Sequence, residues 1–150
     1  MTIEGPLDLG PWRDRLTEAV TVFRDVGLSA ELLAAQESLR TTPAAFVVPI
    51  SDNPASRPGT GNTIRSQNVN ATVAVVLAVS NSRGSSSGSE ASTDLQAIRR
   101  AVMDSLIGWQ PPGADLGISY AGGRAFAFKD STVWWTDRFL TSYFVRKEFS

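Results

Sequence analysis

The sequence predicts an α+β fold in which a mixed, mainly antiparallel sheet of about four strands packs against two to three helices, in the order ααββαββ. One segment near the N-terminus, and another that begins at residue 93, repeat apolar residues every three or four positions, as helices do. Residues 68–80 alternate between two faces, as a strand does, and the C-terminal part is rich in aromatic residues. The 150 residues suit one domain, 1–150, with a core that needs no covalent staple.

Two helices are expected at the start of the chain. Residues 10–27 have the spacing of an amphipathic helix, with Pro11 suited to its first position and Gly27 to its end. Ser29 is a typical N-cap for a second, shorter helix, which Pro43 prevents from continuing. Both helices would pack an apolar face on the sheet.

The middle of the chain predicts two strands and a loop. Residues 44–50 indicate a short strand, and Pro49 implies that it ends there or lies at a sheet edge. Residues 51–62 hold two prolines and two glycines without periodicity, which predicts a long exposed loop. The strand over 68–80 has one strongly apolar face and a second face of small residues, which could lie under a helix or against a neighbouring subunit.

A flexible segment and a third helix should follow. Residues 81–92 are rich in glycine and serine, a composition that cannot bury apolar surface. Thr93 and Gln96 have the spacing of a capping box, and the helix that they open should end near Gly108. That helix would pack on the sheet.

The segment 107–124 raises the choice between a ligand-binding loop and a simple connection. Its two prolines cannot extend a helix, so helix termination explains most of it. Two strands are then expected, joined at 129–132, with Phe126 and Phe128 on one face. The last strand should continue almost to the C-terminus.

Composition excludes several classes of function. The chain has no cysteine, so disulfides, thiolate metal sites and cysteine nucleophiles are absent, and it has no histidine, the commonest general base and transition-metal ligand. A net charge of −1 without a run of four basic residues argues against a reader of duplex DNA. The longest apolar run is too short to span a membrane, and the N-terminus lacks the pattern of a signal peptide, so we expect a cytosolic protein.

The remaining catalytic and binding motifs are weak. The glycine-rich stretches 57–63 and 84–89 each lack an essential part of a phosphate-binding loop. Serines have no base beyond the two lysines, and Asp130 and Asp137 favour solvated or salt-bridged roles, Asp130 in a turn and Asp137 on a strand face. We therefore expect no enzyme activity, no catalytic or metal-binding residues and no cofactor.

Adjacent Trp134 and Trp135 must point to opposite faces of a regular strand. One ring can join the core, and the other needs a helix, a loop or another subunit to cover it. Aromatic residues on this strand could also stack nucleic-acid bases, but no basic groove accompanies them. The pair is a hint of assembly.

The order of "LRTTPAAFVVPI", "VAVVLAVSN", "DLQAIRRAVMDSLIGWQPPGAD", "YAGGR" and "VWWTDRFLTSYFVR" resembles the tail terminator, or tail completion, proteins of long-tailed bacteriophages and prophages. The similarity spans residues 39–146, and the segments "GWQPPGAD" and "WWTDRF" are its most specific parts. The first 40 residues match only in being helical. The quoted motifs are structural and not catalytic.

The resemblance implies a structural virion protein, assembled in the host bacterial cytoplasm, whose subunits form a hexameric ring. Such a ring caps the tail tube, ends its polymerisation and presents a surface to the head-completion proteins of the neck. DNA would pass through the lumen without sequence recognition. The implied partners are copies of the chain itself, the tail tube protein and a head-completion protein, with no membrane involved.

Five residues are candidates for interface contacts. Three arginines in or beside the two long loops would lie at subunit, tube or neck interfaces, and the two adjacent tryptophans are candidates because one of them needs cover: Arg57, Arg65, Arg83, Trp134 and Trp135. Three alternatives stay open. They are another head–tail joining or neck component, a small enzyme or ligand-binding domain that uses the glycine-rich loops, and a nucleic-acid module.

Overall fold

The computed structural model describes residues 3–39, 41–55, 59–60, 64–80, 89–129 and 131–148. The helices of this part are α1 (Gly10–Ala19), α2 (Ser29–Glu37) and α3 (Ser89–Leu106). The strands are β1 (Ile3–Glu4), β2 (Asp25–Gly27), β3 (Ala44–Pro54), β4 (Gly59–Thr60), β5 (Ile64–Ser80), β6 (Ser119–Lys129) and β7 (Thr132–Glu148).

All strands of the described residues belong to one sheet, whose main order is β1-β7-β5-β3-β2, with β4 beside β5 and β6 beside β7. The pairing of β2 with β3 is parallel and the other named pairs are antiparallel, so the predicted mixed, mainly antiparallel sheet with helices is confirmed. The predicted strand number and order are wrong, because the described part has seven strands and not about four. The strands missed, β1, β2 and β4, have two or three residues each, too few to leave an alternating pattern.

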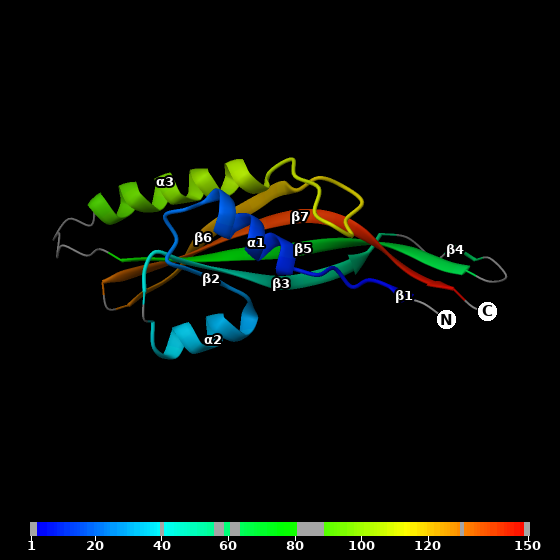
Figure 1. Cartoon of the computed structure of the whole chain (residues 1–150), viewed down its shortest axis with the longest axis horizontal. Helices are drawn as coiled ribbons and strands as arrows, with labels where there is room; N and C mark the ends of the chain where they lie inside the picture. Colours follow the sequence, from blue (N-terminus) through cyan, green and yellow to red (C-terminus); the bar gives the residue numbers. More distant parts are fainter. Residues whose placement is uncertain are drawn as a thin grey trace.

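Both faces of β5 are apolar, and helices cover each (Figure 1). Trp12 and Leu16 of α1, together with residues of α3, pack on the odd-numbered side chains of 73–79. Leu32 and Ala35 of α2 pack near the even-numbered side chains on the opposite face. The small-residue face therefore lies under a helix, which was one of the two predicted possibilities. The main core cluster comprises Trp12, Leu16, Val20, Ala45, Val47, Val73, Val75, Leu77, Val79, Leu95, Ile98, Val102, Leu106, Ile118 and Phe139.

Helix α1 ends at Ala19, so the prediction that it runs to Gly27 is wrong. The run Val20-Thr21-Val22 is β-branched and has low helix propensity. The backbone N–H of Arg24 then donates to the carbonyl oxygen of Pro43 at 2.9 Å, and residues 25–27 continue as β2 beside β3.

Gly27 has a different role from the predicted helix end. A Cβ atom there would lie 2.6 Å from Cβ of Glu31, so glycine allows α2 to turn closely back on β2. Ser29 is the first residue of α2 and not its cap, because Leu28 occupies the N-cap position. The Glu31 carboxylate instead accepts the backbone N–H of Leu28, at 3.2 Å.

Strand β3 continues past Pro49 to Pro54, with a register shift between Pro49 and Ser51. Its end was therefore predicted too early, but among the described residues Pro49 does lie at an edge, because β2 reaches only as far as residue 46 of β3. The predicted loop over 51–62 is wrong at both ends, since 51–54 belong to β3 and 59–60 form β4. Residues 56–58 and 61–63 lie outside the described residues.

Helix α3 begins at Ser89, so Thr93 lies inside it and the predicted capping box does not open it. Of the glycine- and serine-rich segment, residues 81–88 lie outside the described residues. The predicted end of the helix is confirmed, because α3 stops at Leu106 and Gly108 has a φ of +86°. Sequence alone could not fix the start, since serine and glutamate are compatible with both a helix and a linker.

The segment after α3 closes one end of the core, in agreement with helix termination. Pro111 is fully buried, and the Trp109 ring packs edge-on against Trp12 with centroids 6.2 Å apart. The Arg15 guanidinium lies over the Trp109 ring, 4.8 Å from its centroid. This segment anchors α3 to α1.

The β6–β7 hairpin forms at the predicted place, with Ser131 at a φ of 62° in its turn. The prediction that Phe126 and Phe128 share a face is wrong. A register shift between Ala125 and Ala127 interrupts the alternation. The Phe126 ring contacts Trp134 on the α2 face, whereas Phe128 pairs with Val133, which packs on the α1–α3 face.

Candidate interaction surfaces

A buried carboxylate on β7 organises a polar cluster between the sheet and α3. Asp137 is 0% exposed. Arg99 of α3 donates to it twice, from Nε to Oδ2 at 3.0 Å and from Nη2 to Oδ1 at 2.9 Å. Tyr120 Oη and Trp135 Nε1 each donate to Oδ1 at 3.0 Å. Four donated hydrogen bonds satisfy this carboxylate, which was predicted to be solvated or salt-bridged and proves to be a buried ion pair.

The packing around Asp137 depends on a glycine in the neighbouring strand. A Cβ atom at Gly123 of β6 would overlap Asp137 Oδ1 and lie 2.8 Å from Tyr120 Oη. Hydrogen bonding to Asp137 raises the pKa of Arg99 against the opposing effect of burial. Burial, and then the hydrogen bond to Asp137, raises the pKa of Tyr120. Arg99, Tyr120 and Asp137 hydrogen-bond to one another, so the cluster joins α3, β6 and β7 rather than presenting an acid or base to a substrate.

A second polar contact lies towards the other end of the sheet. Tyr143 of β7 is 3% exposed and donates its hydroxyl to Asp52 Oδ2 of β3 at 2.8 Å. Burial, the hydrogen bond and the negative charge of Asp52 together raise the pKa of Tyr143 to about 12. The contact crosses β5 and joins β7 to the far end of β3.

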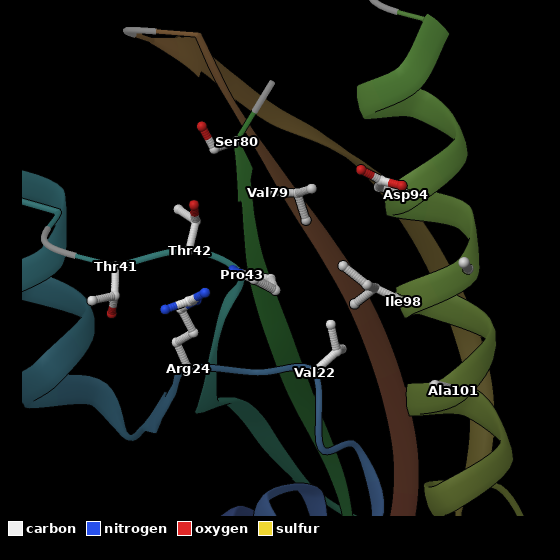
Figure 2. Close-up of a pocket in the computed structure, with 11 residues that line it drawn as sticks. Val22, Arg24, Thr41, Thr42, Pro43, Val79, Ser80, Asp94, Ile98 and Ala101 are labelled. Carbon is white, nitrogen blue, oxygen red and sulfur yellow. The ribbon is translucent and has the colours of Figure 1, made fainter. Parts of the chain in front are cut away.

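A pocket of about 700 Å³ opens between α3 and the β2–β3 side of the sheet. We call it the α3 pocket. Figure 2 shows Asp94 on the α3 side and Arg24 on the opposite side, with Val79 and Ile98 between them. Its lining residues are Val22, Arg24, Thr41, Thr42, Pro43, Val79, Ser80, Asp94, Ala97, Ile98 and Ala101. An apolar floor with two opposite charges at the sides can receive an apolar group that carries a charge beside it.

Exposed apolar side chains gather on β6, which pairs only with β7 among the described strands. Phe128 is 76% exposed and Phe126 is 49% exposed. An aromatic edge strand of this kind is an unusual feature for a protein that acts alone, because unpaired strand edges invite association. The edge is therefore a candidate contact surface.

The structure places three of the five predicted interface residues. Arg65 is exposed on β5, opposite Lys147 of β7. Trp134 is 5% exposed, with its ring stacked on Phe46, so packing within the chain accounts for its burial. Arg57 and Arg83 lie outside the described residues.

The two tryptophans point to opposite faces, as predicted, because Trp134 packs with the α2-side cluster and Trp135 with the α1–α3 core. The Arg99 guanidinium lies 4.4 Å from the Trp135 ring centroid and covers that ring. The chain itself thus supplies much of the cover that the sequence left open to another subunit.

Two features escaped sequence reasoning. The α3 pocket combines residues from four separate segments, and no local pattern reveals such a combination. Phe128 was identified only as a strand residue, although its place one residue before the predicted junction at 129–132 could have indicated a position near the exposed tip of a hairpin.

Among the described residues, no group of three or more acidic side chains is placed to hold a metal ion. No helix in this part of the chain has the length and hydropathy needed to cross a membrane.

Comparison with known families gives one match across almost the whole chain. A family model described as "Phage tail terminator protein" matches residues 2–148. A search of curated proteins finds no matching relative.

Proposed function

The chain belongs to the phage tail terminator family, and from this premise we propose that its copies form a ring that caps the tail tube and ends tube polymerisation. Membership makes it a structural component of the phage tail. The number of six subunits comes from the resemblance described above. The ring would also present a surface to the head-completion protein of the neck, and DNA would pass through its lumen without sequence recognition.

The single observation that supports self-assembly best is the aromatic edge of β6. Phe128 and Phe126 leave much of their surface in water, on a strand that has β7 as its one neighbour in the described part of the chain. Covering such side chains stabilises an interface by about 25 cal/mol for each Å² of apolar surface removed from water. A structural rather than catalytic role agrees with the hydrogen bonds that Arg99 and Tyr120 donate to Asp137.

The decisive experiment mixes the purified protein with tail tubes that lack a terminator and follows tube length by electron microscopy. We expect the protein to bind at tube ends and to stop further growth when tube protein is added. An unrelated protein of similar size and net charge is the control. Tubes that keep growing, with no density added at their ends, would refute the capping function.

A second candidate function rests on the α3 pocket, whose volume of about 700 Å³ lies in the range of small-molecule sites. This candidate function predicts a monomer or dimer that binds a small apolar ligand and does not bind tail tubes. The same mixing experiment separates the two candidates.

A further inference from the structure

We propose that copies of this chain join head to tail, with the ring of Phe128 in one copy seated in the α3 pocket of the next. This inference rests on the proposed function, because it takes self-assembly of the chain as given. It goes further by naming the two surfaces that meet.

The α3 pocket suits an aromatic side chain. Its floor includes the buried side chains of Val79 and Ile98, and Val22 at its border is 51% exposed. A volume of about 700 Å³ leaves room for a phenyl ring together with the backbone that carries it. An entering ring would remove Val22 from water, which favours association.

The tip of the β6–β7 hairpin offers the matching group. At 76%, Phe128 is the most exposed of the large apolar side chains whose burial the structure describes, and exposed Lys129 follows it directly. In the pocket, Asp94 stands on the α3 side and Arg24 on the opposite side (Figure 2). The hairpin would enter with Lys129 towards Asp94, because the charges are opposite there, whereas the side of Arg24 would bring like charges together.

The two surfaces also lie at the same level along the strands. Phe128 pairs with Val133, and Val133 pairs with Val79, which lines the pocket. At this level β6 forms one lateral edge of the sheet, and β2 with the start of β3 forms the other. A neighbour displaced sideways, by rotation about an axis parallel to the strands, would therefore bring the tip of one copy to the pocket of the other.

A second pocket, at another level of the sheet, is less suitable. It measures about 350 Å³ and is lined by Glu4, Asp8, Asp115 and Tyr143, among others. Tyr143 is ten residues beyond Val133 on β7, or about 33 Å along the strand at 3.3 Å per residue. A lateral neighbour would have to slide by that distance to reach it.

A contact between two different surfaces on opposite edges is heterologous and leaves one free tip and one free pocket on every pair. Such contacts repeat from copy to copy, and they close into a ring when a whole number of these rotations makes up one full turn. A symmetric dimer would instead require each surface to meet its own copy.

The first test is a directed cross-link, for which the chain is suited because it contains no cysteine. Chains carrying Lys129→Cys are mixed with size-tagged chains carrying Asp94→Cys and oxidised under conditions in which the wild type self-associates or binds tubes. We expect mixed dimers, because a disulfide forms only when Cα atoms approach within about 7 Å. Either variant alone should give none. Phe144→Cys, an exposed position far along β7, is the control partner for Asp94→Cys.

The second test measures association of variants by light scattering. Phe128→Ala should weaken subunit association at least about tenfold, as loss of a central aromatic contact does, and Phe144→Ala should not. Ala97→Glu, an exposed helix position on the pocket wall, should weaken it similarly. A mixture of Phe128→Ala and Ala97→Glu chains retains one intact tip and one intact pocket, and it should give dimers and nothing larger.

The outcomes separate this inference from the proposed function. Wild-type oligomers or capped tubes without the Lys129–Asp94 cross-link would overturn the tip-in-pocket contact and leave the terminator function standing. Association unchanged by Phe128→Ala would do the same and would return the pocket to the small-ligand alternative. A wild type that neither self-associates nor binds tube ends would refute both.

Discussion

Replacing Arg99 by methionine should destabilise the fold by about 3 kcal/mol, because it leaves the buried carboxylate of Asp137 without its cation. Removing one partner of a buried ion pair costs about 3–5 kcal/mol. The lower figure applies here because the Arg99 side chain is 14% exposed, so water can reach part of the cluster. For a chain of this length the change corresponds to a melting temperature lower by roughly 6–12 °C.

The assay is urea unfolding followed by circular dichroism, with Arg100→Met as the control. Arg100 is the next residue of α3 and is exposed, so its loss should change the free energy of unfolding by less than about 0.5 kcal/mol. The double variant Arg99→Met/Asp137→Leu removes both charges and should recover much of the loss. Equal effects of Arg99→Met and Arg100→Met would refute the assignment of the cluster as a structural ion pair.

Three further predictions follow from separate contacts. Because the folded-state pKa of Tyr143 is raised from 10 to about 12, its contribution to stability is complete below pH 10 and is lost as the pH rises through 12. Wild type should therefore lose about 3 kcal/mol more than Tyr143→Phe across that window in urea titrations, and parallel curves would contradict this. Gly27→Ala should cost about 1–3 kcal/mol in the same assay, since its Cβ would meet Glu31 at 2.6 Å, and an unchanged midpoint would show that α2 moves freely. Alanine substitution of Arg57, Arg65 and Arg83 together should reduce the fraction of completed tails seen by electron microscopy without lowering stability. Normal tails would show that these arginines are not interface contacts.

Sequence patterns located the elements that bury a continuous face. The alternation over 68–80 and the helical spacing before Leu106 survive in β5 and α3 because each packs one side of its residues on a common core. The predicted boundaries of helices and strands were wrong where contacts with residues distant in the sequence determine them. Residues 25–27 form a strand through their pairing with β3, and Thr93 lies inside a helix that begins earlier.

The candidate surfaces were harder to predict for a related reason. Asp137 was recognised as a salt-bridge candidate, but its partner Arg99 lies 38 positions away and meets it only because α3 crosses β7. A single inserted residue in β6 separated Phe126 from Phe128, and no pattern in the sequence indicates that shift. The family resemblance, which was drawn from residues 39–146, was confirmed by a family model that matches residues 2–148.

The ion pair and the proposed contact are linked through α3. Ala97 and Asp94 form the pocket wall, and Arg99, on the same helix, fastens it to Asp137 of β7 and to Tyr120 of β6, the strand that carries Phe128. Loss of the contacts that hold α3 should weaken subunit association as well as lower stability, because a mobile pocket wall must be ordered when the subunits bind. At a temperature where Arg99→Met stays folded, we expect association several-fold weaker than in Arg100→Met, together with faster hydrogen exchange of the α3 amides. Faster exchange with unchanged association would mean that the wall of the α3 pocket takes no part in joining the subunits.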